Sequence, residues 1–419
     1  MVAVIMAGGK GTRIQEINSE IPKPMISVLG KPILQYQIEA LARQGVKDVV
    51  LVIGHLGHVI KNYFADGKNF GIRIKYIEES EPLGTAGALY LLKEEISDDF
   101  LLLCGDLIFD IDIKKFYAAH KKYGGKVTLF THPNSHPYDS GIIVADENGK
   151  VTDWLHKEDK RLWYRNRVNA GLHFMSHRIL DSFTELKKLD LDRDVLKLLI
   201  PKGEIYVYDS PEYVKDMGTP ERYYSVIEDI QSGKVSAKNL TNKQKAIFLD
   251  RDGTINEYVG FLRNINDFKL LDGVAEAIKR VNESGYLAIV VSNQPVIARG
   301  EVSFSELREI HNKMETLLGT EGAYLDGIYY CPHHPDKGYE GERSEYKIDC
   351  NCRKPKSGML LQAAECFNID LTKSYMIGDS ENDILCGRNA GCKTAFIGDN
   401  LNADVCGKDL LDCIKKIFG

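Results

Sequence analysis

Apolar and polar positions along the first half of the chain alternate between strand-like and helix-like patterns. Three continuous apolar runs, VAVIMA, DVVLVIG and FLLLCGDL, are typical of central parallel strands that are buried on both faces. Between these runs, residues 32–44 and 85–96 carry apolar positions at helical spacing. This alternation predicts an α/β fold with a mostly parallel sheet. Over residues 126–208 the predicted strands follow one another more closely, which indicates a mixed sheet there.

The pattern breaks at residues 233–245, GKVSAKNLTNKQK, which are polar, lysine-rich and without apolar periodicity. Such a composition is typical of a flexible linker. The alternation restarts at Ala246 with AIFLD, a helical stretch over 273–285, YLAIVVSNQ, a further helix, LDGIYYCP, SYMIGD and KTAFIG. The sequence therefore predicts two α/β domains, over residues 1–232 and 246–419.

Length and composition agree with this division, because 419 residues are too many for one ordinary core. The net charge of −6 argues against a nucleic acid or an anionic membrane as the partner. The first residues lack the charged leader of a secretion signal, and nowhere do about eighteen apolar residues follow one another. We expect a cytoplasmic protein that binds small phosphorylated ligands. The oligomeric state is left open, a homo-oligomer included.

A glycine-rich turn follows the first apolar run, in the sequence AGGKGTR over residues 7–13. Glycines let backbone N–H groups approach phosphate oxygens closely, and Arg13 is suited to bidentate contact with phosphates. A plain tight turn is the alternative, since the ending of a Walker A loop is absent.

Four further motifs follow in order and favour a nucleotide site. Lys23 lies between two prolines, which present one positive charge on a stiff segment. Residues 83–87, LGTAG, place small residues at a predicted helix start, where free N–H groups can meet a base or ribose. Asp106 ends the third apolar run, where α/β sheets bind ligands, and Asp216 lies in another predicted loop.

Together these five motifs resemble the sugar-phosphate nucleotidyltransferase family over residues 1–225, and within it the mannose-1-phosphate and heptose-1-phosphate guanylyltransferases. The resemblance implies a Rossmann-like domain that transfers a nucleotidyl group from a nucleoside triphosphate, in this branch GTP, to a sugar 1-phosphate, releasing pyrophosphate. It implies that Lys23 contacts the α-phosphate and that Asp106 and Asp216 bind Mg²⁺, which screens the repulsion between two anionic substrates. The residues expected to hold the nucleotide are Gly8, Gly9, Gly11, Thr12, Arg13, Gly84, Thr85 and Gly87.

Two further positions are expected to face the sugar phosphate. The family carries a Glu-Lys pair whose lysine meets this phosphate, and the gapless match here is His156-Lys157, so that the glutamate is missing although Glu158 lies nearby. Lys157 inherits the role, with a solvated charged turn as the alternative. Asn169 matches the family's sugar-facing segment and is a candidate partner for a hydroxyl group, with strand-end packing as the alternative.

The second half opens with Asp250 and Asp252 directly after an apolar strand. One carboxylate can attack phosphorus while the other protonates the leaving oxygen and later activates water. Two acids at a strand end could also be solvent-facing turn residues, so the assignment depends on partners. These partners follow in order along the chain as Ser292 with Asn293, Arg353 with Lys354, and Asp379 with Asp383.

This order of motifs resembles the haloacid dehalogenase superfamily over residues 245–419, and implies a Rossmannoid domain. By that resemblance Asp250 is the nucleophile, which forms an aspartyl-phosphate, and Asp252 is the acid/base. Ser292 and Lys354 hold the phosphate, and the short interval before Ser292 leaves no room for a large cap. The resemblance implies Mg²⁺ held by Asp250, Asp379 and the backbone carbonyl of Asp252, with Asp383 supporting the loop.

The interval before Arg353 contains a C-x-H pair and a C-x-C pair, which together offer the four ligands of a closed structural zinc site. The expected ligands are Cys331, His333, Cys350 and Cys352. Reduced cysteines packed beside a loop are the alternative. Such a zinc ion would brace the loop that carries Arg353.

The zinc loop, with FLDRDGTIN and CRKPKSGML, is similar to the heptose 1,7-bisphosphate phosphatases, with histidinol-phosphate phosphatases as close relatives. Asn293 and Arg353 are expected to contact substrate, and Arg299 is a candidate for the far phosphate. The relatives have a small residue and glycine after SNQ, where this chain has Pro295-Val296, so the specificity of this loop is open.

The presence of both halves in one chain favours the interpretation that they catalyse consecutive steps. Removal of the 7-phosphate from a heptose bisphosphate yields a heptose 1-phosphate, which is the substrate expected for the first half. We therefore expect a bifunctional enzyme of nucleotide-activated heptose synthesis, making GDP-D-glycero-D-manno-heptose. For each half, two alternatives stay open. The first half could be a sugar-nucleotide sensor without catalysis or a mannose-1-phosphate guanylyltransferase, and the second a histidinol-phosphate-like or general phosphatase.

Overall fold

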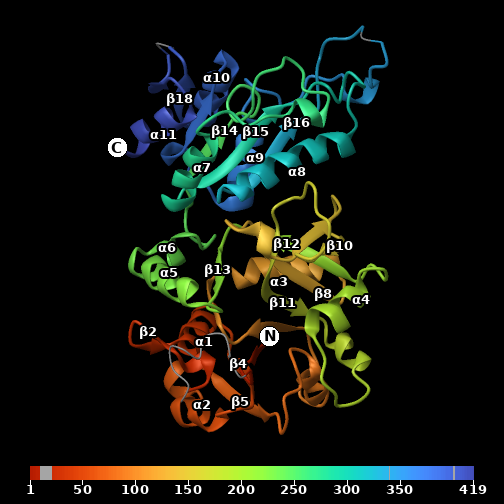
Figure 1. The fold of residues 1–419 in the computed structure, drawn as a ribbon, viewed down its shortest axis with the longest axis vertical. Coiled ribbons are helices and arrows are strands. Elements are labelled where there is room, and N and C mark those ends of the chain that lie inside the picture. Colours follow the sequence, from red (N-terminus) through yellow and green to blue (C-terminus); the bar gives the residue numbers. More distant parts are fainter. Residues whose placement is uncertain (10–20, 339, 400–401) are drawn as a thin grey trace. The chain divides into compact units, whose positions relative to one another are not determined.

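The computed structural model describes residues 1–9, 21–338, 340–399 and 402–419, which form two compact units (Figure 1). Unit 1 comprises Met1–His132, Ile143–Trp154 and Asn169–Asn239. Unit 2 comprises Pro133–Ile142, Leu155–Val168 and Leu240–Gly419. The boundary at Asn239 and Leu240 lies within the segment expected to be a linker.

The segment 233–245 is folded along most of its length. It contains helix α6 (Lys234–Ala237), and Leu240 and Gln244 are buried. Asn239 Nδ2 donates to Asp110 Oδ1 of unit 1 at 2.8 Å, while Asn368 of unit 2 donates to the carbonyl of Leu240 at 2.9 Å. Each half of this segment therefore makes hydrogen bonds within its own unit.

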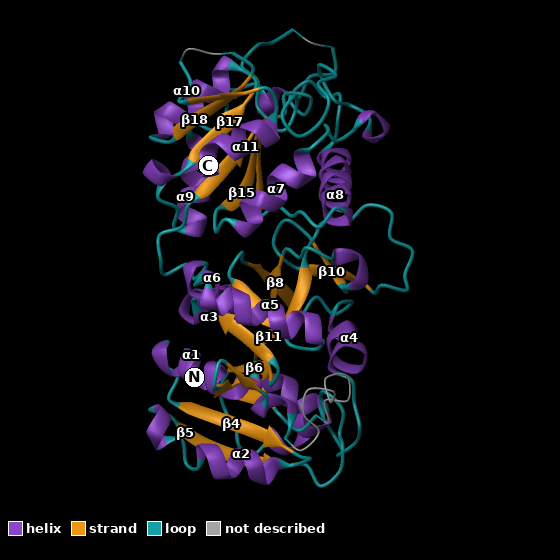
Figure 2. Cartoon of the chain, turned by 60° about the vertical axis from the view of Figure 1, so that its left-hand side comes forward, coloured by secondary structure: helices purple, strands orange, loops and turns teal. Residues whose placement is uncertain are grey.

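Unit 1 contains a nine-stranded mixed sheet, as the spacing of the apolar runs predicts (Figure 2). Its main order is β10-β9-β11-β6-β1-β4-β5, and β8 pairs with both β11 and β12. Strands β6, β1, β4 and β5 are parallel, whereas β11 is antiparallel to β6 and β9. The strands are β1 (Val2–Met6), β4 (Asp48–Ile53), β5 (Arg73–Glu78), β6 (Phe100–Cys104), β8 (Val127–His132), β9 (Ile142–Ala145), β10 (Val151–Leu155), β11 (Val168–Met175) and β12 (Ile205–Asp209).

Both faces of this sheet are buried, which explains why its central strands are continuous apolar runs. Along β6, Leu101 and Leu103 pack into one apolar cluster with Leu34 of α1, and Leu102 packs into the opposite cluster with Leu89. The helices of the unit are α1 (Ile33–Arg43), α2 (Gly57–Phe64), α3 (Ile113–Tyr123), α4 (Lys197–Leu199), α5 (Pro220–Gln231) and α6, with shorter helical turns at η2 (Lys23–Met25), η3 (Lys68–Phe70), η4 (Gly87–Leu92), η6 (His177–Ser182) and η7 (Leu191–Leu196).

Two short antiparallel ribbons complete unit 1. One pairs β2 (Ser27–Val28) with β3 (Lys31–Pro32), and the other pairs β7 (Leu107–Asp110) with β13 (Tyr213–Asp216). The second ribbon extends from the end of β6 and carries acidic residues toward the carboxyl edge of the sheet.

Unit 2 is built on a six-stranded, entirely parallel sheet with the order β16-β15-β14-β17-β18-β19. Helices α7, α8 and α11 cover one face of the sheet, and α9 and α10 cover the other. Alternate residues of β14 pack into the two apolar clusters that these helices form with the sheet. The strands are β14 (Ala246–Leu249), β15 (Leu287–Asn293), β16 (Gly327–Cys331), β17 (Tyr375–Gly378), β18 (Lys393–Ile397) and β19 (Val405–Gly407). The helices are α7 (Val274–Glu283), α8 (Phe304–Thr320), α9 (Gly358–Phe367), α10 (Glu381–Ala390) and α11 (Leu410–Phe418), with shorter turns at η5 (Pro137–Asp139), η8 (Ile265–Asp267), η9 (Ser344–Tyr346) and η10 (Leu371–Lys373).

Only η8 and α7 stand between β14 and β15, so unit 2 has no large cap at that position, as expected. Two segments from the first half of the chain belong to this unit. In one of them, Arg167 forms a buried ion pair with Glu315 of α8 at 3.1 Å, and the Tyr164 N–H donates to Thr316 Oγ1 at 2.9 Å. Among the described residues, the helices are all too short or too polar to cross a bilayer.

Candidate functional sites

The predicted phosphate-binding turn begins where β1 ends. Gly8 and Gly9 are described, whereas Gly11, Thr12 and Arg13 lie outside the described residues. A Cβ atom on Gly8 would lie 2.0 Å from Oε2 of Glu79, so this glycine makes room for a carboxylate that follows β5.

Lys23 and Asp106 form an ion pair between Lys23 Nζ and Asp106 Oδ2. Lys23 opens η2, and Asp106 lies in the turn between β6 and β7. The turn approaches β1 closely, since a Cβ atom on Gly105 would lie 2.7 Å from the Met6 carbonyl. The structure thus brings together the cation and one of the two acids that the sequence assigns to this site.

The second acid lies beside the first. Asp216 ends β13, where it pairs with Leu107, and the N–H of Met217 donates to the carbonyl of Asp106 at 3.0 Å. Both carboxylate oxygens of Asp216 accept from Nη1 of Arg222, at 2.8 and 2.7 Å. Burial would raise the pKa of Asp216, but this guanidinium outweighs it and lowers the pKa below its usual value.

Arg222 and Gln37 support this pair of acids and were missed by the sequence reasoning. Gln37 is fully buried on α1 and donates from Nε2 to the carbonyls of Cys104 and Leu107, both at 2.9 Å, which fixes the turn that carries Asp106. Gln37 could have been found from the sequence, because it is a polar residue on the apolar face of the helix predicted over 32–44. No comparable sequence signal pointed to Arg222, which lies in the first turn of α5.

The glycines of residues 83–87 have a packing role in the structure. A Cβ atom would lie 2.4 Å from the Leu189 carbonyl at Gly84 and 2.1 Å from the Lys187 carbonyl at Gly87. The N–H of Ala86 donates to Leu189 at 3.0 Å, and Thr85 Oγ1 accepts from Leu191 at 2.7 Å. The N–H groups of Ala86 and Gly87 are therefore occupied within the protein, the second by the Leu83 carbonyl at 3.1 Å. This isolated bridge between Gly84 and Leu189 also accounts for a short η4 in place of the longer helix expected over 85–96.

The two residues expected at the sugar phosphate are in different units. Asn169, near the start of β11, belongs to unit 1, where its Oδ1 accepts from the N–H of Gly171 at 3.3 Å. Lys157 is exposed in a turn of a segment that belongs to unit 2. Unit 1 by itself therefore does not contain Lys157.

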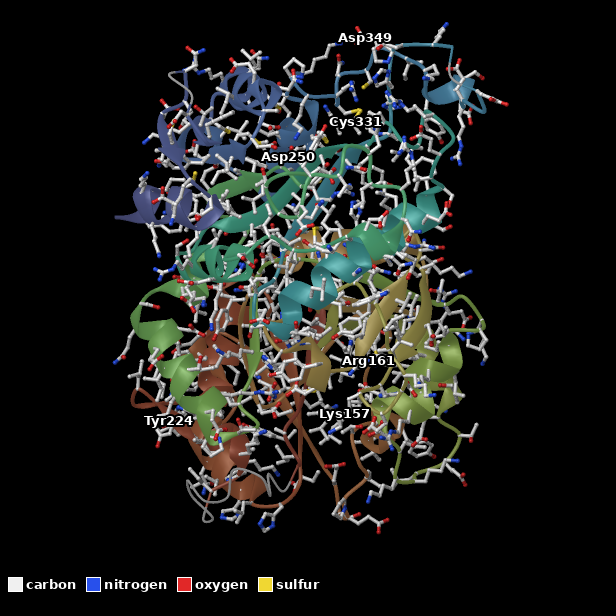
Figure 3. All side chains as sticks on the ribbon, turned by 45° about the horizontal axis from the view of Figure 1, so that its top comes forward. Lys157, Arg161, Tyr224, Asp250, Cys331 and Asp349 are labelled. Carbon is white, nitrogen blue, oxygen red and sulfur yellow. The ribbon has the colours of Figure 1, made fainter. Side chains whose placement is uncertain are left out.

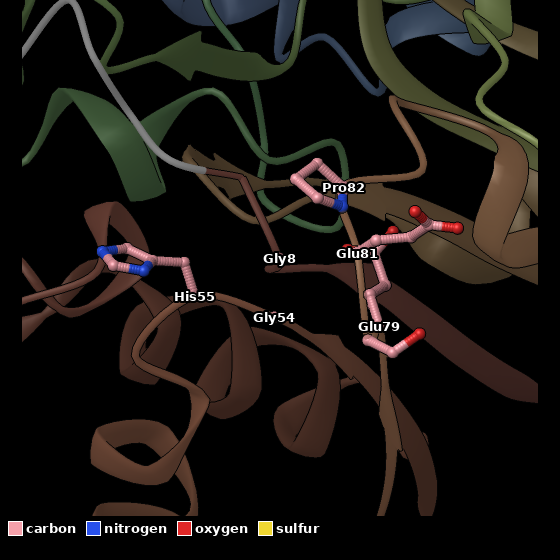
Figure 4. Close-up of a pocket in the computed structure, with 7 residues that line it drawn as sticks. Gly8, Gly54, His55, Glu79, Glu81 and Pro82 are labelled. Carbon is pink, nitrogen blue, oxygen red and sulfur yellow. The ribbon is translucent and has the colours of Figure 1, made fainter.

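A pocket of about 200 Å³ opens at the carboxyl ends of β1, β4 and β5 (Figure 4). His55 lies on one side of it, and Glu81 and Pro82 lie on the other. Its lining residues are Gly8, Gly54, His55, Glu79, Ser80, Glu81 and Pro82. Apart from Gly8, none of these was assigned to the site from the sequence.

In unit 2, three carboxylates meet at the carboxyl edge of the sheet. One oxygen each from Asp250, Asp379 and Asp383 lies within 4.8 Å of the others. Gly253, with φ of 85°, makes this possible because a Cβ atom there would lie 2.0 Å from Asp379 Oδ2. Three acids at this spacing fit a divalent cation with oxygen ligands.

Lys354 is the cation of this cluster. Its Nζ lies 2.7 Å from Asp250 Oδ1 and 2.6 Å from Asp383 Oδ1, and its side chain is 3% exposed. Burial, with repulsion from Asp383 and Asp252, raises the pKa of Asp250 to about 7, although Lys354 opposes this shift. The same carboxylates raise the pKa of Lys354 against the effect of burial, so this lysine stays charged.

Asp252 is paired with Arg251, which is fully buried. Nη2 of Arg251 donates to both oxygens of Asp252 at 2.8 Å. Gln294 Nε2 donates to Asp252 Oδ2 at 2.9 Å and to Ser292 Oγ at 2.8 Å, which links the predicted acid/base to the predicted phosphate holder. Burial and Arg251 lower the pKa of His311 to about 3, so its neutral Nε2 can accept from Arg251.

The remaining predicted residues of this site make contacts within the protein. Asn293 Nδ2 donates to the Lys354 carbonyl and its Oδ1 accepts from the Lys354 N–H, at 3.1 and 3.0 Å, so Asn293 fixes the lysine's backbone. Arg353 donates to the His333 carbonyl at 3.2 Å. The guanidinium of Arg299 lies 4.0 Å from the centre of the Phe261 ring. In the loop after SNQ, where the sequence differs from its relatives, Val296 is buried in a small apolar cluster.

The four predicted metal ligands converge at the end of β16, which lies at the same sheet edge as Asp250 (Figure 3). The sulfur atoms of Cys331, Cys350 and Cys352 lie 3.1–3.4 Å from one another, and His333 Nδ1 lies 3.3 Å from Cys352 Sγ. Three thiols and an imidazole with converging donor atoms fit a tetrahedral metal ion. The neighbouring His334 is not part of this group.

Comparison with known proteins supplies the family. Residues 2–233 match the model of the nucleotidyl transferase family, and residues 351–400 match that of HAD-like hydrolases. The chain belongs to the nucleotidyl transferase family. It carries a hydrolase of the HAD type in its second half.

Among the relatives, the D-glycero-beta-D-manno-heptose-1,7-bisphosphate 7-phosphatase of Haemophilus ducreyi is 46% identical over 155 residues, which are 37% of this chain and 82% of the relative. A UTP–glucose-1-phosphate uridylyltransferase of Synechocystis is 30% identical over 250 residues, 56% of this chain and 64% of the relative. A mannose-1-phosphate guanylyltransferase catalytic subunit beta of Xenopus tropicalis is 30% identical over 228 residues, 53% of this chain and 62% of the relative.

The protein is therefore an enzyme with a nucleotidyltransferase part and a phosphatase part that is related to the heptose bisphosphate phosphatases. The chain spans less than two thirds of the two transferase relatives, and these relatives differ in the base of the nucleotide. The two transferase relatives therefore agree on the type of reaction but differ in the base and in the sugar of their substrates.

Proposed function

We propose that this transferase–phosphatase catalyses two consecutive steps toward a nucleotide-activated heptose. The phosphatase removes the 7-phosphate of D-glycero-D-manno-heptose 1,7-bisphosphate, and the transferase then joins GMP from GTP to the heptose 1-phosphate. The observation that carries the proposal is the cluster of Asp250, Lys354, Asp379 and Asp383 in a domain related to heptose bisphosphate phosphatases. The partners are then small phosphorylated molecules in the cytoplasm.

In the phosphatase step, a carboxylate oxygen of Asp250 attacks the phosphorus of the 7-phosphate, and the bond from phosphorus to the sugar oxygen breaks. Asp252 gives a proton to the leaving sugar oxygen. It then takes a proton from the water that hydrolyses the aspartyl-phosphate and releases phosphate. The Gln294 bridge between Asp252 and Ser292 supports this division of roles, because it holds the acid/base beside the phosphate-binding hydroxyl.

In the transfer step, an oxygen of the sugar 1-phosphate attacks the α-phosphorus of the nucleotide, and pyrophosphate leaves. No general base is required, because the attacking phosphate is already ionised at neutral pH. The chain supplies Lys23 as a fixed cation beside Asp106 and Asp216.

The proposal includes two kinds of metal. Asp106 with Asp216, and Asp250 with Asp379, offer oxygen ligands suited to Mg²⁺, which would neutralise phosphate charge during each displacement. The Cys331 cluster suits a structural Zn²⁺. The hydrogen bond from Arg353 to the carbonyl of His333 supports a bracing role for that ion.

Two assays test the proposal. Phosphate release from the heptose bisphosphate is compared with release from histidinol phosphate and simple esters, and pyrophosphate release is measured with mannose 1-phosphate and both anomers of heptose 1-phosphate. We expect Asp250→Asn to abolish phosphatase activity and leave transfer intact, and Asp106→Asn to do the converse. Equal hydrolysis of all esters, or loss of both activities from one substitution in a folded protein, contradicts the proposal.

A further inference from the structure

A buried acid of helix α8 lies outside the three-carboxylate cluster of the phosphatase. The side chain of Glu315 is 2% exposed, and its partner is Arg167, whose side chain is 4% exposed. Arg167 belongs to the inserted segments, the name used here for residues 133–142 and 155–168, which are part of unit 2 although they come from the first half of the chain. Because a buried charge is stable only with a partner, this ion pair ties the inserted segments to α8.

Arg167 also connects α8 to the sheet of unit 2. Its Nη1 donates to the carbonyls of Asn166 at 2.7 Å and Leu325 at 3.4 Å, and its Nη2 donates to the carbonyl of Asp326 at 3.3 Å. Leu325 and Asp326 directly precede β16. One guanidinium therefore fixes the distance between α8 and the start of a strand.

Two further contacts hold the C-terminal half of α8 against the inserted segments. Thr316 Oγ1 accepts from the N–H of Tyr164 at 2.9 Å. A Cβ atom on Gly319 would lie 2.6 Å from Cγ of Pro137, so this glycine allows the close approach of the first inserted segment. With the Glu315 ion pair, the last two turns of the helix are held by both inserted segments.

One turn earlier, α8 reaches the phosphatase site. His311 precedes Glu315 by four residues, so the two side chains lie on the same face of the helix. Nε2 of His311 accepts from Nη1 of Arg251 at 3.3 Å, and Nη2 of the same guanidinium donates to both oxygens of Asp252 at 2.8 Å. The direction of the Arg251 guanidinium, and with it the place of the Asp252 carboxylate, therefore depends on where α8 holds His311.

We infer that Arg167 is a positioning residue for Asp252, the acid/base of the phosphatase. It acts through α8 and His311, which hold the Arg251 guanidinium against the Asp252 carboxylate. The inference rests on the role proposed above for Asp252. Since Arg167 lies within residues 2–233, which match the nucleotidyl transferase family, a residue of the first half of the chain sets the efficiency of the second.

The leaving group of the substrate separates positioning from general damage to the fold. The hydroxyl of a sugar is a poor leaving group that needs a proton from Asp252, whereas p-nitrophenolate leaves without one. If Asp252 is displaced, cleavage of a sugar phosphate slows and cleavage of p-nitrophenyl phosphate does not. Damage to the cluster around Asp250, by contrast, slows both reactions.

The test measures leaving-group release in single turnovers of the full-length protein, with the heptose bisphosphate and with p-nitrophenyl phosphate. Arg167→Lys keeps the charge beside Glu315 but loses the planar fork that reaches two further carbonyls. We expect it to slow cleavage of the heptose bisphosphate about 10- to 100-fold and that of p-nitrophenyl phosphate less than about twofold. Arg165→Lys is the matched control, because Arg165 is exposed two residues away, and it should leave both rates unchanged.

The route through His311 is tested by combining two substitutions. His311→Gln should show the same dependence on the leaving group as Arg167→Lys. The double variant should be within about twofold of the poorer single variant, because both changes act on one contact. Rate losses that multiply in the double variant would show that Arg167 does not act through His311 and would overturn the inference.

A second variant and a stability measurement guard against loss of folding. Thr316→Val removes the bond to Tyr164 without touching the ion pair, and it should slow the heptose bisphosphate reaction in the same selective way, by about two- to tenfold. Thermal unfolding of each variant shows whether unit 2 is intact. Equal slowing of both esters, or no slowing in any folded variant, overturns the inference. If the wild-type protein hydrolyses p-nitrophenyl phosphate but not the heptose bisphosphate, the proposed function fails, and glycerol phosphate serves as the ester of a poor leaving group in the same comparison.

Discussion

Nζ of Lys354 lies 2.6 Å from Oδ1 of Asp383, a fully buried acid at the start of helix α10. The other oxygen of Asp383 accepts from the Oγ of Ser380 at 2.6 Å and from its N–H at 3.1 Å. One buried carboxylate therefore joins the cation of the phosphatase site to the cap of a helix. Asp250, which shares the same lysine at 2.7 Å, depends on this arrangement for its place.

Asp383→Asn should impair both the phosphatase and the stability of its domain. The amide cannot neutralise Lys354, and removing one partner of a buried pair costs about 3–5 kcal/mol. Phosphate release and thermal unfolding provide the measurements, with Glu381→Gln in the same helix turn as the control. Transferase activity should be unchanged. A variant with wild-type melting temperature and phosphatase rate would show that Asp383 has no such role.

In Arg251→Met, ionisation of Asp252 should lower the stability of the fold, whereas in the wild type it raises that stability. In the wild type the pKa of Asp252 is lowered, because Arg251 outweighs burial, so its contribution is present above the unfolded pKa of about 3.9 and lost as pH falls. Without Arg251, burial raises the pKa, so the ionised acid destabilises the variant as pH rises.

The measurement is the melting temperature of wild type and Arg251→Met between pH 4 and 7. The difference between the two proteins should widen as pH rises. Arg251→Lys, which keeps a positive charge without the bidentate contact, should fall between them. A constant difference across this range would mean that Arg251 acts through packing alone.

The strands and the residues at their ends could be predicted from the sequence, because each strand that is buried on both faces is a continuous apolar run. Strands β1, β6 and β14 coincide with such runs. Asp250 directly follows β14, and Asp106 comes two residues after the end of β6. The convergence of Cys331, His333, Cys350 and Cys352 could be predicted because a C-x-H pair and a C-x-C pair together supply the four ligands of a tetrahedral metal site.

The contacts that organise the sites could not be predicted in this way. The pairing of Asp216 with Arg222, and of Asp252 with the fully buried Arg251, depends on side-chain directions that no periodicity encodes. Gly84 could be read as a ligand-binding glycine, since the sequence does not show that residue 189 approaches it. Nor did any pattern indicate that Lys157 belongs to unit 2.

Cys350→Ser should loosen the loop that carries Arg353 and lower phosphatase activity. It removes one of four converging donor atoms, and the bond from Arg353 to the His333 carbonyl transmits the change. Bound zinc, measured by elemental analysis, should fall in parallel with the melting temperature of the phosphatase domain. Cys366→Ser, outside the cluster, should leave both values and the transferase unchanged. Retention of one zinc per chain in Cys350→Ser would contradict the assignment.

Gly84→Ala should destabilise the transferase more than a change at another glycine of similar conformation. Gly84 has φ of 77° and Gly45 has φ of 84°, so alanine is strained at both positions by about 1–2 kcal/mol. The new Cβ meets nothing within 4 Å at Gly45, but at Gly84 it would lie 2.4 Å from the Leu189 carbonyl. Backbone at that distance must move, at a further cost of about 1–3 kcal/mol. The shift would also disturb the bond from the Leu191 N–H to Thr85 Oγ1. Thermal unfolding of both variants separates the two effects, and equal losses at Gly84 and Gly45 would show that the Leu189 contact contributes nothing.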